Sequence, residues 1–338
     1  MTAPCQLLQP TTAFQALEDL ACASWSAELL FAAIKLELFA HLESGPIALS
    51  TLARAAHCQE GPLGRMLPAL AGLGLIEGGP GGWSNCPVAS RHLVPGLAGY
   101  LGDLLLYRRY LQPPWQELAA RVSTQPLAPD LRREDDYPTR NLHYVRALDQ
   151  LARQKAREIT TLLTATPWHG PILDIGGGAG ALGRAFSHGH GATVTLFELP
   201  EVLAAAHAIY PDPGAWAGMT TRAGDFRDHP FAPAERFGLI LLANVLHTYD
   251  PAEAQASLDK AVALLAPGGV LLIHDYCPDR TPIKGPLYDL LMMLNTPRGV
   301  CHEAQTLAGW LAARGLSGIQ IIDLASDSSL ILGSRPPC

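Results

Sequence analysis

The sequence is poor in charge, poor in basic residues and without long uncharged apolar runs. Only 16% of the 338 residues are charged, and 24 lysines and arginines against 31 acids give a net charge of −7. A polyanion repels a negatively charged protein, so nucleic acid is not expected as the main partner. No uncharged apolar run approaches the roughly 18 residues of a membrane span, so none is predicted.

The seven cysteines are scattered, and no two of them form a CxxC pair. Neither a disulfide framework nor a zinc knuckle is therefore indicated. The first residues do not show a basic segment followed by an apolar one, so no signal peptide is predicted. These features together predict a cytoplasmic protein. At this length, two domains are more usual than one.

Residues 1–100 are predicted to form helices followed by a glycine-rich hairpin, an order typical of a winged helix. Ser50 is expected to cap one short helix, and a second helix is expected from Leu63 to Leu73. Such a module suggests DNA binding, which requires several lysines or arginines for the phosphates. The region has four cations against seven acids, and its recognition helix would offer only Arg65. We therefore predict a dimerisation module.

Residues 101–165 are predicted to be a helical linker that contributes to a substrate pocket. A break is expected at Pro113-Pro114, a turn-rich segment at 130–140, and a long helix at about 141–164. Three aromatic side chains of this linker either line a pocket for a flat ligand or pack in the core: Tyr107, Tyr110 and Trp115.

From residue 166 to 338, short apolar segments alternate with helical ones. Five predicted strands lie in PILDIGG, TVTLFELP, TTRAGDF, FGLILLANVLH and GGVLLIHDY. Two more, IQIIDLA and SSLILGS, flank Ser326-Asp327 at a spacing suited to a hairpin. The sequence therefore predicts an α/β domain in which helices cover both faces of a mostly parallel sheet that one antiparallel strand closes.

The glycine-rich segment ILDIGGGAGALGRAF satisfies two templates. Gly176, Gly178 and Ala181 form a tolerable dinucleotide fingerprint. Asp174, Gly176, Gly178 and Gly180 fit the second template, that of a loop that binds S-adenosylmethionine. A single glycine motif does not decide between the two ligands, so the neighbouring residues must.

Acidic residues after the first three predicted strands favour S-adenosylmethionine. Asp174 can orient the glycine loop and reach the ammonium of the ligand through water. Glu198 ends the next strand, where a carboxylate can accept from both ribose hydroxyls. Asp225 can accept from the adenine amine while the ring of Phe226 packs on the base. A dinucleotide site does not require an acid at all three places.

These features follow one another in the order of a known family. ILDIGGGAG, FELP and GDF precede a histidine after the fourth strand and then DLLMMLNTPRG. Together with the winged-helix-like start, they resemble the S-adenosylmethionine-dependent O-methyltransferases of the caffeate, hydroxyindole and polyketide type. The segment LACASWSAELLFAAIKLELFAHL is also similar to one in the bacteriochlorophyllide methyltransferase branch. The resemblance implies the class I methyltransferase fold, with a Rossmann-like sheet and an antiparallel last strand, and a homodimer formed through the amino-terminal domain.

The resemblance also implies a base. His247 would remove the proton of the acceptor hydroxyl, and Asp275 would support it, one methylene shorter than the usual acid. Two positions depart from the family: Thr248 stands where an aspartate is usual, and Cys301 replaces a glutamate. A histidine base needs a carboxylate to fix its tautomer, which a neutral thiol cannot do. Either His247 works with one carboxylate, or the acceptor needs little base, or His247 merely ends a strand.

The acceptor is predicted to be a flat, largely apolar small molecule, because soft and aromatic side chains suit such a pocket. The candidate acceptor residues are Tyr107, Trp115, Met292, Asn295, Thr296 and Cys301. His247, His274, Cys301 and His302 also raise the question of a metal. Strand alternation puts His274 on the face opposite Asp275, so no metal is predicted.

The predicted reaction is methyl transfer from S-adenosylmethionine to a hydroxyl group. Two alternatives stay open at this stage. One is methylation at carbon or sulfur, or a non-methylating reaction, in which His247 is not a base. The other is a regulator that binds the cofactor without turnover.

Overall fold

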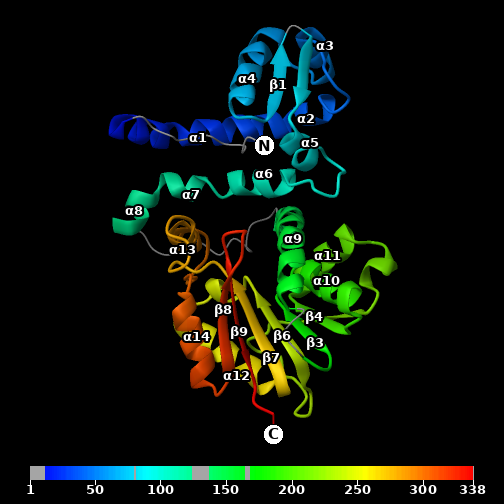
Figure 1. The fold of residues 1–338 in the computed structure, drawn as a ribbon, viewed down its shortest axis with the longest axis vertical. Helices are drawn as coiled ribbons and strands as arrows, with labels where there is room; N and C mark the ends of the chain where they lie inside the picture. Colours follow the sequence, from blue (N-terminus) through cyan, green and yellow to red (C-terminus); the bar gives the residue numbers. More distant parts are fainter. Residues whose placement is uncertain (1–11, 80, 124–136, 164–167, 338) are drawn as a thin grey trace. The chain divides into compact units, whose positions relative to one another are not determined.

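The computed structural model describes residues 12–79, 81–123, 137–163 and 168–337. The chain forms two compact units, residues 1–110 and 111–338 (Figure 1). The predicted linker, residues 101–165, is therefore divided between the two units. Most of its turn-rich part, 130–140, lies outside the described residues.

The first unit is mainly helical and carries one small hairpin. Its elements are α1 (Ala13–Lys35), α2 (Leu38–His41), α3 (Leu49–Ala55), α4 (Glu60–Gly72), β1 (Ile76–Gly79), β2 (Gly82–Asn85), α5 (Pro87–His92) and α6 (Gly102–Tyr110). β1 and β2 pair in antiparallel fashion, as the glycine-rich stretch predicts. Phe39, Leu52 and Leu67 lie at the centre of the core of this unit.

The predicted cap at Ser50 is wrong. α3 begins at Leu49, and its N-cap is Ala48, which makes no side-chain hydrogen bond. Ile47 pairs with Trp83 through two backbone hydrogen bonds of 2.9 Å. This pairing ends the extended backbone at Ala48, so the helix starts earlier than the hydroxyl of Ser50 suggests.

One face of α1 exposes large apolar side chains. Phe14, Leu17, Leu20 and Trp25 are each at least two-thirds exposed. Contiguous apolar surface of this kind is typical of a face that another protein surface covers.

The second unit contains all seven strands predicted from the carboxy-terminal half. Its elements are α7 (Pro113–Gln116), α8 (Leu118–Ser123), α9 (Tyr137–Leu162), β3 (Ile172–Ile175), α10 (Ala181–His190), β4 (Val194–Glu198), α11 (Pro200–Ile209), η3 (Pro213–Trp216), β5 (Met219–Ala223), β6 (Phe237–Ala243), η4 (Leu246–Thr248), α12 (Pro251–Ala263), β7 (Leu265–Asp275), α13 (Lys284–Asn295), α14 (Ala304–Ala313), β8 (Ser317–Asp323) and β9 (Ser329–Ser334). Pro113 and Pro114 begin α7, because proline suits the first turn of a helix.

The seven strands form one sheet in the order β5-β4-β3-β6-β7-β9-β8. β9 runs opposite to the other six strands, so its pairings with β7 and β8 are antiparallel. It lies between β7 and β8, so it is inserted into the sheet and does not close its edge. The strand order reverses between β3 and β6, where ligands of doubly wound sheets bind.

Alternating side chains of the strands bury the sheet on both faces. Leu173 and Ile240 pack with α12 and α14 in one cluster. Ile172 and Leu241 pack with α9 and α10 in another. The helices lie on both sides of the sheet in Figure 1. Because both faces are covered, the strand ends are where polar side chains reach a ligand. In the described parts of the chain, no helix has the length and apolarity to cross a bilayer.

Candidate active site

A histidine–aspartate pair lies at the carboxyl ends of β6 and β7. His247 sits on the short helix η4 that follows β6, and Asp275 is the last residue of β7. The two strands are parallel neighbours, so their ends meet. His247 Nδ1 lies 2.5 Å from Asp275 Oδ1, and the backbone N–H of His247 donates to Asp275 Oδ2 at 3.3 Å. Both side chains are buried.

Asp275 is held as a carboxylate. Burial on its own would raise its pKa, but the neighbouring His247 ring and the N–H of Tyr276, at 2.8 Å, together hold the pKa below its usual value. The carboxylate therefore fixes His247 with its proton on Nδ1. Nε2 is left as the ring nitrogen that can accept a proton.

The segment 296–302 packs on the turn that carries His247. His302 Nε2 donates to the carbonyl of Leu246 at 3.2 Å. A Cβ on Gly299 would lie 2.7 Å from the carbonyl oxygen of His247, so only glycine fits there without a shift. Thr296 Oγ1 accepts from the N–H of Gly299 at 2.8 Å and so holds this turn closed.

The two positions that depart from the family do not supply a second acid. Thr248 Oγ1 donates to the carbonyl of Val245 at 2.7 Å, so its hydroxyl is used within η4. Burial, with Asp275 nearby, raises the pKa of the Cys301 thiol, which is therefore neutral at pH 7. Sequence reasoning missed Asp289, which accepts from the Cys301 N–H at 2.8 Å. The two residues are 12 positions apart, and no sequence pattern indicates that they meet.

The glycine loop lies beside the same strand ends. Gly176 and Gly178 have φ of +65° and +59°, values that favour glycine. A Cβ on Gly176 would lie 2.7 Å from a methyl group of Val245, so the loop touches the segment after β6. Glu198 accepts from the N–H of Gly178 at 3.0 Å and from the N–H of Leu199 at 2.7 Å. Glu198 thus ties the loop to the end of β4, and burial raises its pKa.

Asp174 lies beneath the loop and is fully buried. Its Oδ2 accepts from the N–H of Gly183 at 3.1 Å, which anchors the first turn of α10. Its Oδ1 has no hydrogen-bond partner among the described residues. Burial raises the pKa of Asp174 to about 7, against the opposing effect of Gly183. Gly180 is the N-cap of α10 and completes the loop with φ +81°.

Asp225 and Phe226 follow β5, as expected, but each already has a partner within the protein. Asp225 forms an ion pair with Arg227, with 2.6 Å between Oδ2 and Nη2. The ring of Phe226 is buried between those of Phe197 and Phe231, with centroid distances of 5.9 and 5.8 Å.

The candidate acceptor residues fall in both units. Tyr107 lies on α6 of the first unit, where its ring stacks on Tyr110. In the second unit, α13 packs against α7, which carries Trp115, and against η4, which carries His247. Met292 and Asn295 lie on α13, and Thr296 follows it. Within the second unit, the structure therefore brings α13 next to His247.

His274 faces away from His247. Its Nε2 lies 2.9 Å from Ser328 Oγ, and its Nδ1 lies 3.4 Å from Asn244 Nδ2. In the part of the chain that the structure describes, no three histidine, cysteine or acidic side chains are grouped to hold a metal ion.

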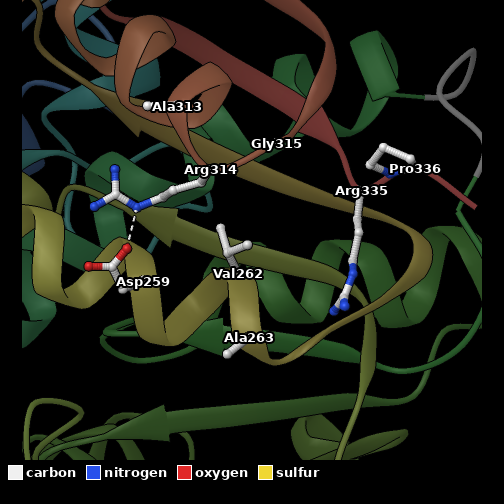
Figure 2. Close-up of a pocket in the computed structure, with 8 residues that line it drawn as sticks. All are labelled: Asp259, Val262, Ala263, Ala313, Arg314, Gly315, Arg335 and Pro336. Atoms are coloured by element: carbon white, nitrogen blue, oxygen red, sulfur yellow. Dashed lines mark hydrogen bonds and ion pairs between the residues drawn. The ribbon is translucent and has the colours of Figure 1, made fainter.

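A shallow cavity of about 800 Å³ lies far from these residues, at the end of the sheet where β7 begins. Figure 2 shows Arg314 paired with Asp259 in this cavity, at 2.8 Å. Arg335 donates to the carbonyl of Leu265, the first residue of β7. The cavity is therefore at the opposite strand end from His247.

Comparison with known families and proteins agrees with this geometry. The pattern of the O-methyltransferase domain matches residues 131–317, and that of the O-methyltransferase dimerisation domain matches residues 18–95. The acetylserotonin O-methyltransferase of Mus musculus is 33% identical over 284 residues, 77% of this chain and 72% of that protein. The 3-hydroxy-5-methyl-1-naphthoate 3-O-methyltransferase of Streptomyces sahachiroi is 29% identical over 322 residues, 92% of this chain and 91% of that protein.

The fold agrees as well. The structure of human N-acetylserotonin methyltransferase in complex with S-adenosylmethionine superposes with a TM-score of 0.85 at 22% identity, and covers 97% of this chain and 99% of that one. The matched domain spans more than half of this chain and contains both the glycine loop and the His247–Asp275 pair. The chain therefore belongs to the O-methyltransferase family.

Proposed function

We propose that the protein methylates a hydroxyl group of a flat, largely apolar small molecule, with His247 as the general base. Family membership accounts for O-methyl transfer to a small molecule. The observation that carries the finer proposal is the 2.5 Å contact between His247 Nδ1 and Asp275 Oδ1, beside the glycine loop.

The residues of the loop suit S-adenosylmethionine, the methyl donor of this family. When bound, it supplies a methyl group activated by a sulfonium. Each carboxylate oxygen of Glu198 accepts from one backbone N–H and has a further lone pair that can accept from a ribose hydroxyl. The unpartnered Oδ1 of Asp174 also suits a ligand or water that donates a hydrogen bond. We assign Asp225 to the adenine amine and the ring of Phe226 to the adenine ring, as the sequence predicts.

The chemistry of His247 follows from its tautomer. With the proton on Nδ1 held by Asp275, Nε2 takes the proton of the acceptor hydroxyl as the oxygen attacks the methyl carbon. The Asp275 carboxylate stabilises the imidazolium that forms. Because Cys301 stays a neutral thiol, His247 works with one carboxylate. A positioned base of this kind contributes roughly 10²–10⁴-fold to the rate.

The acceptor is assigned to the surface formed by α13 and α7. Met292 and Trp115 supply soft and aromatic area, whereas Asn295 and Thr296 supply polar groups. We also assign Tyr107 and Cys301 to the acceptor. The names of the two relatives, an acetylserotonin and a hydroxynaphthoate O-methyltransferase, support a flat bicyclic acceptor.

We propose that the protein acts as a homodimer. The match to the dimerisation domain and the exposed apolar face of α1 support this assignment. A cytoplasmic location stays a prediction from the sequence.

Two measurements test the proposed function. Calorimetry with S-adenosylmethionine should show binding by the wild type and by Glu77→Gln, an exposed control on β1, and a clear loss with Glu198→Ala. A labelled-methyl assay should show product with hydroxyindole or hydroxynaphthoate acceptors and none with matched thiols. Absence of cofactor binding, or transfer to thiols alone, would sink the proposal.

A further inference from the structure

The side-chain amide of Asn244 lies at the carboxyl end of β6, three residues before His247. Its φ is +56°, in the left-handed region that asparagine tolerates. Its N–H donates to the carbonyl of His274 at 2.7 Å, and its Nδ2 lies 3.4 Å from His274 Nδ1. Its Oδ1 is buried and has no hydrogen-bond partner among the described residues. A buried carbonyl oxygen of this kind is unfavourable unless a ligand or water donates to it.

A buried chain of polar groups leads to the His274 ring that this amide contacts. Lys155 Nζ, on α9, donates to Ser328 Oγ at 2.8 Å and to Tyr276 Oη at 3.0 Å. Ser328 Oγ lies 2.9 Å from His274 Nε2. Burial, together with the nearby Lys155 ammonium, lowers the pKa of His274 to about 3, so the ring is neutral.

The direction of each hydrogen bond follows from the amide, because its Nδ2, which can only donate, faces His274 Nδ1. His274 Nε2–H donates to Ser328 Oγ, whose second lone pair accepts from Lys155. His274 Nδ1 is then an acceptor and receives the amide N–H of Asn244. The nitrogen of the amide faces His274, so the oxygen points the other way.

The segment that carries Asn244 lies against the glycine loop. Val245, the next residue, is the one that Gly176 touches. β6 and β3 are neighbours at the point where the strand order reverses. Glu198 and Asp225, which the proposed function assigns to the ribose and the adenine, lie on the far side of β3. A ligand held there would place its opposite end, the amino-acid part, over β6.

We propose that Asn244 Oδ1 accepts a hydrogen bond from the α-ammonium of the bound cofactor, and that His274, Ser328 and Lys155 are positioning residues that aim it. This inference rests on the proposed function. It adds a recognition group for the cofactor whose direction is set by residues from α9, from β7 and from the segment between β8 and β9.

Calorimetry with two ligands tests the contact. S-adenosylmethionine carries the ammonium, and 5′-methylthioadenosine has the nucleoside without the amino-acid part. Asn244→Gly removes the amide but keeps a residue that tolerates positive φ. We expect it to weaken S-adenosylmethionine roughly 10–100-fold, as for a hydrogen bond to a charged group, and to leave methylthioadenosine unchanged. Asn244→Asp retains an oxygen acceptor and should retain most of the affinity.

Other results would contradict either the inference or the proposed function, and the experiment tells these apart. Equal losses for the two ligands would show a merely structural role, and an effect limited to the KM of the acceptor would place the contact there; either would overturn the inference. A larger loss with Asn244→Asp than with Asn244→Gly would show that the amide is a donor, which also contradicts it. If the wild type binds neither ligand, the proposed function itself is wrong.

The positioning role needs its own variants. His274→Leu removes both ring contacts and should reproduce the selective loss of Asn244→Gly. His274→Gln keeps one donor and one acceptor and should restore part of the affinity for S-adenosylmethionine. If both variants lower the unfolding temperature but bind the two ligands as the wild type does, His274 does not position Asn244.

Discussion

Asp174 and Asp275 are both buried aspartates at the carboxyl ends of strands in one sheet, yet the structure gives them opposite charge preferences. Asp174 accepts one described hydrogen bond, from the N–H of Gly183, and burial raises its pKa to about 7. Asp275 accepts from the His247 ring and from the N–H groups of His247 and Tyr276, and its pKa is lowered.

The difference shows that burial alone does not decide the charge of a carboxyl group. Desolvation raises the pKa at both sites. At Asp275 the charge interaction with His247 and the hydrogen bonds from His247 and Tyr276 outweigh it, whereas the one hydrogen bond from Gly183 does not outweigh it at Asp174. Asp275 can stabilise an imidazolium, which suits the role proposed for His247. Asp174, with a pKa of about 7, is protonated in about half of the molecules at pH 7, and it anchors the glycine loop from beneath.

Asp275→Asn should have the largest effect. An amide cannot stabilise the imidazolium and allows the wrong tautomer, so we expect kcat to fall roughly 10²–10⁴-fold. The lowered pKa means that the carboxylate adds stability above its ordinary pKa of about 4, which is lost as pH falls through the folded value. Urea unfolding should therefore show the variant less stable at pH 7 and closer to the wild type at pH 3. A variant with wild-type kcat would show that Asp275 does not support His247 in the reaction.

Asp174→Asn should raise the stability of the fold at neutral and higher pH, whereas Asp275→Asn lowers it. Because the folded pKa of about 7 lies above the usual 3.8, ionisation destabilises the fold progressively between about pH 4 and pH 7. An asparagine does not ionise, so the cofactor-free variant should be more stable than the wild type by roughly 2–4 kcal/mol at pH 8. The difference should vanish at pH 4. Glu198 and Arg184 also act on Asp174, so the same titration on Glu198→Ala serves as the control. A difference that does not change with pH would contradict the assignment.

Gly299→Ala separates geometry from charge, because it leaves both aspartates in place. The added methyl group would press on Thr296 Oγ1 and on the carbonyl of His247 and displace the turn that carries His247, so we expect kcat to fall about 10-fold with unchanged binding of the cofactor. Gly309→Ala on α14 is the matched control, since nothing lies within 4 Å of its added Cβ. Equal rates for the two alanine variants would show that the His247 turn tolerates the shift.

The sequence was enough to predict the seven strands of the large sheet and the place of His247. Apolar runs bounded by glycine, proline and acidic residues identify strands, because both faces of this sheet are buried. The insertion of β9 between β7 and β8 was not predictable, because hairpin spacing does not say which strand pairs with β7.

The charge states and the contacts between distant residues were not predictable either. LDIG and IHDY both place an acid near the end of an apolar strand, yet the pKa of one acid is raised to about 7 and the pKa of the other is lowered. Lys155 and Ser328 are 173 positions apart and meet only in the folded chain. The cap at Ser50 failed for a similar reason, because the pairing of Ile47 with Trp83 sets the start of the helix.

The proposed role of His247 as a base supported by Asp275 can be tested by the rate of methyl transfer to phenols of decreasing pKa. With a phenol of pKa about 10, His247→Gln should lower kcat/KM roughly 10²–10⁴-fold. With phenols that are already ionised at the assay pH, the ratio of wild type to variant should fall toward one. A loss that stays constant across the series would contradict the account, because it would show that His247 binds or shapes the site without taking the proton.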